Sequence, residues 1–162
     1  MRLLLDTHVM LWWLNRDHRL TRPVRSSIEQ QADQVLVSAA SAWEIAIKRA
    51  MGKLEPPSRW HQEIAEYGFE PLAITFDHAR EAGELPRHHA DPFDRMLVAQ
   101  ARLEGLTLVT ADPNIAHYDV AVLRPGPTRT TTRSPAGWRR RPASCSWSCA
   151  PTRSQPAPTR GR

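Results

Sequence analysis

Four acidic residues stand where predicted strands end or predicted helices begin, and they are the side chains best placed to do chemistry. Asp6 directly follows the apolar run 2–5, and Glu44 lies in the first turn of the helix predicted after a second strand. Asp94 lies at the start of a later helix, and Asp112 follows the strand predicted over 106–110. In parallel α/β sheets, sites form at the carboxyl ends of the strands. We therefore expect the four carboxylates to converge at one edge of a sheet.

Carboxylates that converge repel one another and raise each other's pKa, so a site that keeps three or four of them ionised needs a cation. These are hard oxygen ligands, and neither a cysteine nor an obligatory histidine accompanies them. Such a donor set suits Mg²⁺ or Mn²⁺ rather than Zn²⁺. Thr110, two residues before Asp112, could hydrogen-bond one of these carboxylates.

Each of these acids also fits a purely structural role. Ser41, three residues before the glutamate, completes the spacing of a capping box. Asp91 precedes a proline as a helix N-cap would, with Asp94 as its partner in the first turn. Asp6 could cap the first helix, and Asp112 could cap or initiate a turn. Capping is the commoner explanation for any one acid, whereas convergence of all four favours catalysis.

The sequence alternates short apolar runs with segments of helical periodicity. Strands are predicted over residues 2–5, 34–37, within 69–74, 106–110 and 120–123. Helices are predicted over residues 7–15, 21–32, 41–51, 58–67, 76–84 and 92–104. Strands separated by helices favour a parallel sheet that is covered on both faces. We therefore expect an α/β fold, a three-layer α/β/α sandwich with a short central parallel sheet of four or five strands.

The overall composition is that of an ordinary globular chain, with 41% hydrophobic and 24% charged residues among 162. No apolar run approaches the ~20 residues that a membrane span needs. The apolar stretch 3–14 is interrupted by polar residues and lacks the cleavage site of a signal peptide. The only cysteines are Cys145 and Cys149, so a disulfide framework in the body is excluded. We expect a cytoplasmic protein with no membrane partner.

Charge divides the chain into two parts. Residues 1–126 carry 14 Lys and Arg against 17 acids, whereas residues 127–162 carry eight Arg, six Pro and no acid. We expect one folded domain over residues 1–126 and a disordered basic tail over residues 127–162. The tail has too few large apolar residues to offset the entropy of ordering. The tail is either an RNA-binding arm, through Arg139, Arg140 and Arg141, or an accidental extension; its composition favours the extension.

The segments around the acids form four motifs. They are Leu4-Leu5-Asp6-Thr7-His8, then Ser41-Ala42-Trp43-Glu44-Ile45-Ala46-Ile47-Lys48 with Gly52-Lys53-Leu54, then His89-Ala90-Asp91-Pro92-Phe93-Asp94-Arg95 and on to Ala101, and Leu108-Val109-Thr110-Ala111-Asp112. In this order and spacing they resemble the PIN-domain ribonuclease toxins of the VapC type. The resemblance covers roughly residues 2–123, and the tail has no counterpart in the family pattern.

This resemblance implies a PIN-like fold and an Mg²⁺- or Mn²⁺-dependent endoribonuclease that acts as the toxin of a toxin–antitoxin pair. It gathers Asp6, Glu44, Asp94 and Asp112 around one or two metal ions, which can activate the attacking water and stabilise the leaving oxygen. We expect Asp6 and Asp94 to be the firmest ligands. Glu44 either binds the metal or acts through a metal-bound water, and Asp112 either supports the ligands or binds a second ion directly. The implied partners are an RNA substrate, a small antitoxin that blocks the acidic site, and a second copy of the chain.

Three basic residues next to the motifs could contact RNA, namely His8, Lys48 and Arg95. Each has an ordinary alternative. His8 fits a polar loop histidine, and Arg95 fits an ion pair with its acidic neighbour. Lys48 stands four residues after Glu44, the spacing of an intrahelical ion pair.

Three further features carry weaker interpretations. His88 and His89 near Asp91 resemble a zinc cluster, but the HExxH spacing of helical zinc sites is missing. Most of the tryptophans Trp12, Trp13 and Trp43, which alternate with aliphatic residues in helices, are expected in the core or at an interface. Trp12 and Trp13 are adjacent in one helix, so they must point in different directions, and an exposed one would mark a partner surface.

Two other classes of function stay open from the residues alone. The first is a metal-dependent phosphohydrolase of small molecules, which would hydrolyse a generic phosphate ester rather than a folded RNA. The second is a non-catalytic RNA-binding module that uses the basic tail. Deletion of residues 127–162 separates this module from the nuclease, because a nuclease keeps its activity without the tail.

Overall fold

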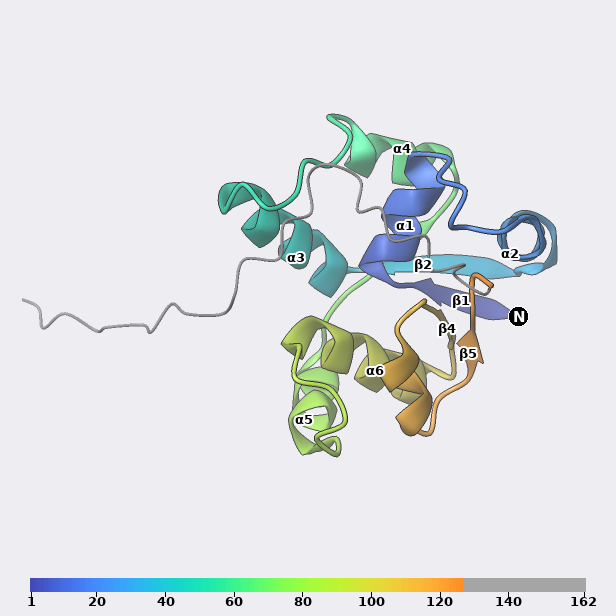
Figure 1. Ribbon diagram of the computed structural model, residues 1–162. Helices are drawn as coiled ribbons and strands as arrows, with labels where there is room; N and C mark the ends of the chain where they lie inside the picture. The colour runs from blue at the N-terminus through green and yellow to red at the C-terminus, as the bar shows by residue number, and fades with distance from the viewer. Residues whose placement is uncertain (127–162) are drawn as a thin grey trace, which may run out of the picture. The chain divides into compact units, whose positions relative to one another are not determined.

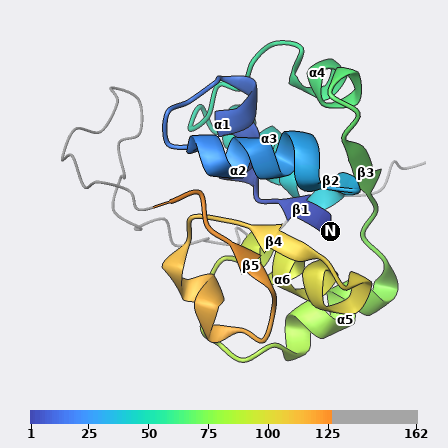
Figure 2. The ribbon, with the colours of Figure 1, turned by 90° about the vertical axis from the view of Figure 1, so that its right-hand side faces the viewer.

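The computed structural model describes residues 1–126, which form a five-stranded parallel sheet with helices on both faces (Figures 1 and 2). The strands are β1 (Arg2–Leu5), β2 (Gln34–Ser38), β3 (Glu70–Leu72), β4 (Thr107–Val109) and β5 (Val122–Leu123). Their order across the sheet is β3-β2-β1-β4-β5. The expected α/β/α sandwich is confirmed. The prediction of a disordered basic tail falls on residues outside the described ones and stays a prediction.

The central strand β1 shows why apolar runs were sufficient to mark the sheet. Leu3, Leu4 and Leu5 are all fully buried. Leu3 and Leu5 pack into the core on one face, and Leu4 packs into the core on the other. A parallel strand that is covered on both faces has no polar side, so its sequence is continuously apolar instead of alternating.

Helices cover both faces of this sheet (Figure 2). One face carries α1 (Thr7–Leu14), α2 (Arg22–Ser26) with the π-helical turn η1 (Ser27–Gln31), α3 (Ala39–Ala50) and α4 (Trp60–Glu66). The other face carries α5 (Phe76–Glu84), α6 (Pro92–Glu104) and the 3₁₀ turn η2 (Pro113–His117). Among residues 1–126, none of the helices has the length and apolar character that crossing a membrane requires.

The start of α3 differs from the sequence-based expectation. The helix predicted over 41–51 begins at Ala39, and Ser38 caps it by accepting a hydrogen bond from the Ala40 N–H at 2.9 Å. Ser38 is also the last residue of β2, so the strand runs into the helix without a loop. This short connection places the first turns of α3 directly at the carboxyl end of β2.

A buried glutamine fixes α6 against the sheet. Gln100 has no exposed surface, and its Oε1 accepts a hydrogen bond from Ser38 Oγ at 2.6 Å. Its Nε2 donates to the carbonyl of Ala73 at 3.1 Å. Because a buried amide must be paired to avoid a desolvation cost of about 1–3 kcal/mol, these contacts define how α6 lies relative to β2. The start of α6 is thereby held near the start of α3.

Candidate active site

Asp6 lies between β1 and α1 and uses its two oxygens differently. Oδ1 accepts a hydrogen bond from the His8 N–H at 3.1 Å and so caps α1. Oδ2 accepts a hydrogen bond from Thr110 Oγ1 at 2.7 Å, from the residue that follows β4. The expected bond between Thr110 and one of the carboxylates is therefore present. Capping uses only Oδ1 of Asp6. The other oxygen, Oδ2, therefore stays at the carboxyl edge of the sheet, beside the residue that follows β4.

Asp6 is held as a carboxylate although it is 5% exposed. Burial by itself raises the pKa of Asp6, but the hydrogen bonds from His8 and Thr110 and the attraction of His8 outweigh that effect, so the pKa lies below its usual value. His8 Nδ1 lies 3.6 Å from Asp6 Oδ1, and this neighbour raises the pKa of His8. The Asp6 carboxylate therefore keeps its negative charge at the end of β1.

Glu44 is buried, and it joins α3 to the start of α1. Its Oε2 accepts a hydrogen bond from Thr7 Oγ1 at 2.6 Å, which brings Glu44 beside Asp6. Its Oε1 is ion-paired with Lys48, so the ordinary explanation of Lys48 is confirmed. An RNA contact by Lys48 stays a prediction.

The capping box predicted for Ser41 and Glu44 is wrong. Because α3 starts at Ala39, Ser38 supplies the cap, and Glu44 lies beyond the first turn. Ser41 Oγ is buried and has no hydrogen-bond partner among the described residues. Glu44 therefore does not cap α3, and its carboxylate is available to the site.

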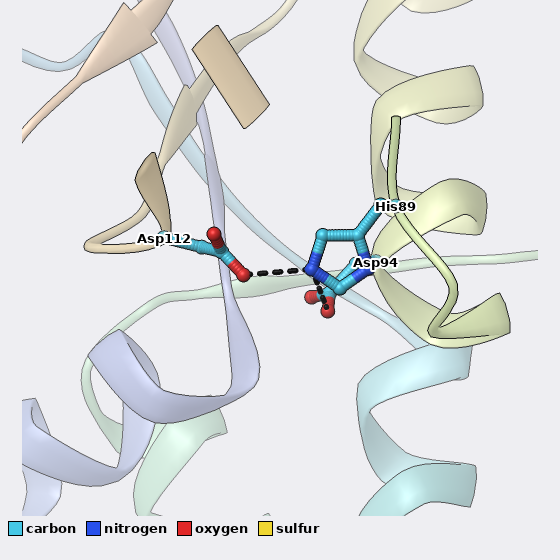
Figure 3. A group of neighbouring side chains, drawn as sticks. All are labelled: His89, Asp94 and Asp112. Atoms are coloured by element: carbon cyan, nitrogen blue, oxygen red, sulfur yellow. Dashed lines mark hydrogen bonds and ion pairs between the residues drawn. The ribbon is translucent and has the colours of Figure 1, made fainter. Parts of the chain in front are cut away.

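His89 joins the other two acids (Figure 3). Its Nε2 lies 2.7 Å from Asp112 Oδ2 and 3.3 Å from Asp94 Oδ2. Its Nδ1 accepts a hydrogen bond from the Asp91 N–H at 3.0 Å, which leaves the ring proton on Nε2, where it faces both carboxylates. The ligating atoms of His89, Asp94 and Asp112 lie within 4.8 Å of one another. A histidine therefore bridges the acids that follow β4 and begin α6.

Two of the expected caps are confirmed, and one expected partner is not. Asp91 accepts a hydrogen bond from the Phe93 N–H at 2.9 Å, and Asp112 Oδ1 accepts one from the Asn114 N–H at 2.7 Å. Asp94, however, does not bond back to the Asp91 N–H, because His89 accepts that proton. Asp94 consequently has no capping role and faces His89 instead.

The pKa of Asp94 shows that the acids are close enough to repel one another. Burial is the largest cause of its rise to about 7, and the charges of Asp6 and Asp91 add to it, with a smaller contribution from Glu44. Asp6 stays ionised while Asp94 tends to hold a proton. Asp94 is thus near enough to Asp6, Asp91 and Glu44 for their charges to act on it, and the gathering of all four site acids around one metal stays a prediction.

The zinc cluster considered for His88 and His89 is not formed among the described residues, because only His89 belongs to the group of possible metal ligands. The ring of His88 instead packs against Tyr118 and His117, at centroid distances of 5.2 and 5.7 Å. Tyr118 Oη accepts a hydrogen bond from the His89 N–H and so fixes the loop that presents His89. Adjacent histidines look alike in the sequence, and only this loop decides which one meets the acids.

Arg95 does not form the ion pair expected with Asp94 among the described residues, and an RNA contact by Arg95 stays a prediction. Its guanidinium donates hydrogen bonds to the carbonyls of Ala82, Leu85 and Pro86 at 2.7–2.8 Å. These carbonyls end α5, where a helix lacks intrahelical partners. Arg95 therefore secures the C-terminus of α5 and is turned away from Asp94.

The tryptophans Trp12, Trp13 and Trp43 differ in their exposure. Trp13 is 5% exposed in the core, and Trp12 is half-buried with the Arg19 guanidinium 4.7 Å from its ring centroid. The adjacent pair thus points in different directions, as expected. Trp43 is 59% exposed, so it does not belong to the core, and a place at an interface stays a prediction.

The donor set fits a hard divalent cation. The carboxylates of Asp94 and Asp112 lie in one group with His89, whose possible ligand atoms are within 4.8 Å of one another, and their oxygens suit such a cation. Asp6 and Glu44 lie outside this group, although the charges of both raise the pKa of Asp94. His89 directs its Nε2 proton at the two carboxylates, so it would bind a cation only after losing that proton.

Comparisons with known proteins agree with this geometry. A family described as "PIN domain" matches residues 3–121. Ribonuclease VapC22 of Mycobacterium tuberculosis is 35% identical over 119 residues, which cover 71% of this chain and 90% of that protein. Among solved structures, VapBC2 of Rickettsia felis bound to a promoter DNA fragment has a TM-score of 0.58 at 14% identity, over 76% of this chain and 98% of that one. FitAcB of Neisseria gonorrhoeae has a TM-score of 0.58 at 23% identity, over 76% and 97%.

Proposed function

Because this chain belongs to the PIN-domain family, we propose that it is a metal-dependent endoribonuclease that hydrolyses RNA phosphodiester bonds, the toxin of a toxin–antitoxin pair. The observation that carries the proposal is the group of His89, Asp94 and Asp112, whose possible ligand atoms lie within 4.8 Å of one another. Such a cluster costs stability unless it binds a cation. The ribonuclease name of the M. tuberculosis relative supports RNA as the substrate.

In this proposal Asp6 and Asp94 hold the cation, and Glu44 and Asp112 complete its surroundings. When bound, Mg²⁺ or Mn²⁺ would position a water for in-line attack on phosphorus and stabilise the oxygen that leaves. Thr110 fixes the orientation of Asp6 Oδ2, and Thr7 and Lys48 fix the two oxygens of Glu44. His89 sets the carboxylates of Asp94 and Asp112 at a defined separation. The carboxylates are thus preorganised before substrate arrives.

The first test is metal-dependent cleavage by the purified full chain, mapped on total RNA. We expect specific cuts with Mg²⁺ or Mn²⁺, a loss of at least ~100-fold when EDTA removes the metal, and recovery when either ion is added back in excess. A generic phosphate monoester serves as the parallel substrate and should stay intact. Cleavage that persists at full rate in EDTA, or preferential hydrolysis of the monoester, would contradict the proposal.

We propose further that a small antitoxin protein inhibits this site. Solved structures with this fold include such assemblies, for example a toxin–antitoxin complex from Klebsiella pneumoniae. The chemistry of the site supports it, because an Arg or Lys offered to these carboxylates would form a charge-assisted hydrogen bond in the place of the cation.

Co-expression tests the antitoxin. Expression of the full chain alone is expected to arrest growth, and the product of a small neighbouring gene is expected to restore it. The Asp94→Asn variant is the control, since it should be harmless with or without that product. Arrest that no neighbouring product relieves would remove the antitoxin from the proposal and leave the nuclease in place.

A further inference from the structure

We propose that Trp43 and Phe93 form a stacking platform for an unpaired base of the RNA, next to the bond that is cut. The inference rests on the proposed ribonuclease function and adds the residues that bind the substrate beside the acids. Trp43 precedes Glu44 on α3, and Phe93 precedes Asp94 on α6. Each ring is therefore the neighbour in sequence of a carboxylate of the site.

The two rings meet across the layers of the fold. Helix α3 packs on one face of the sheet and α6 on the other, and both begin at its carboxyl edge (Figure 1). The ring centroids of Trp43 and Phe93 lie 5.2 Å apart with an interplanar angle of 80°, an edge-to-face pair. The pair consequently joins α3 to the first turn of α6, at positions one residue before an acid of the site in each helix.

Trp43 keeps open surface in this arrangement. An edge-to-face contact covers at most one face of one ring, and Trp43 is 59% exposed while Phe93 is half-buried. A single exposed apolar side chain is ordinary, but a tryptophan anchored by a second ring beside a catalytic cluster offers a rigid flat surface. Nucleobases bind such surfaces by stacking, and they do so whatever their sequence.

The charges around the site favour a base as the occupant. The acids repel the RNA backbone, and residues 1–126 carry three more acids than Lys and Arg. The two long cationic side chains expected to contact RNA are engaged elsewhere, Lys48 with Glu44 and Arg95 with the end of α5. Stacking needs no positive charge, so the ring pair supplies affinity that salt bridges to phosphate do not. A base is also joined to its phosphate through one sugar. When the phosphate lies at the acids, the base therefore lies close to the residues next to the acids.

The test compares Trp43→Leu with Trp43→Phe on a short RNA that contains the wild-type cut site. Leu keeps the apolar contact with Phe93 but has no ring, whereas Phe keeps a ring. Stacking is worth about 1–3 kcal/mol per base, so we expect Trp43→Leu to lower kcat/KM by roughly 5- to 150-fold, chiefly through KM, and Trp43→Phe to retain most of it. Phe76→Leu is the matched control, because Phe76 is 86% exposed at the start of α5. It should cleave as the wild type does.

The second arm removes the base instead of the ring. Two RNAs are used, each with an abasic position on one side of the cut. One of the two is expected to lower the kcat/KM of the wild type by about the same factor as the Trp43→Leu substitution does. The same RNA should cost Trp43→Leu almost nothing more, since the partner of the base is already gone. Equal urea midpoints of the variants would show that folding is not the cause.

Several results would overturn the platform. Full activity of Trp43→Leu, or abasic and Trp43→Leu losses that simply multiply, would leave the pair as a packing contact between α3 and α6, with the ribonuclease intact. Unchanged RNA cleavage with loss of antitoxin inhibition would assign the surface to the protein partner. Absence of any RNA cleavage by the wild type would instead fail the proposed function itself.

Discussion

Asp94→Asn is expected to lower RNA cleavage by at least ~100-fold while leaving the fold intact. Asn keeps the shape of the side chain but removes the charge of a metal ligand, and even residues that only support ligands cost 10- to 100-fold when changed. Because burial and the charges of Asp6 and Asp91 raise the pKa of Asp94 to about 7, the variant also loses a source of repulsion. We therefore expect its Tm without metal to equal or exceed that of the wild type.

Two measurements check this result together, kcat/KM on a mapped RNA and the Tm with and without Mn²⁺. The wild type should be stabilised by Mn²⁺, since the ion binds only the folded site, and Asp94→Asn should lose most of that shift. Asp119→Asn, which changes an exposed acid, is the matched control and should behave as the wild type in both. Asp6→Asn should repeat the loss of activity. Wild-type activity in either site variant would remove that residue from the ligand set.

Glu44→Gln carries the second largest expected effect, a loss of about 10- to 100-fold in cleavage. The Gln amide oxygen can still accept the hydrogen bond from Thr7, so Glu44→Gln keeps the link between α3 and α1. What it loses is the charge, both for the cation and for the ion pair with Lys48. Since Ser38 rather than Glu44 caps α3, the change should hardly affect the urea midpoint of unfolding.

Lys48→Met provides the comparison for this variant. It removes the same ion pair but leaves the Glu44 carboxylate in place, so its loss of activity should be much smaller. Both variants would be measured on one RNA substrate with kcat and KM separated. Equal losses in the two variants would mean that the ion pair, and not the carboxylate, is what cleavage needs.

The structural and functional explanations of the acids prove compatible because a carboxylate has two oxygens. Asp6 caps α1 with Oδ1 and receives Thr110 on Oδ2. Asp112 likewise caps η2 with Oδ1 and meets His89 with Oδ2. A cap places the acid at a helix start, and helix starts in this fold lie at the carboxyl edge of the sheet. For Asp6 and Asp112, the capping role is thus part of how the acid is placed at this edge, whereas Glu44 and Asp94 cap no helix.

The sequence by itself determined the layers of the fold and the placement of Asp6 and Asp112 after the ends of strands. Leu3, Leu4 and Leu5 mark a strand buried on both faces, and helical segments between such strands leave a parallel sheet as the one compact arrangement. In that arrangement, residues that follow strands must share an edge. The position of Asp6 and Asp112 therefore followed from local pattern alone.

Only the tertiary structure decided which neighbours complete the site. Lys48 and Arg95 are both basic residues beside an acid, yet one pairs with Glu44 and the other secures the end of α5. His88 and His89 are adjacent, yet only His89 reaches Asp94 and Asp112. Trp43 was expected in the core or at an interface, and the structure leaves it 59% exposed against Phe93. These outcomes depend on contacts between residues far apart in the chain. Local periodicity predicts only which residues share a face of one helix or strand, and not what that face contacts.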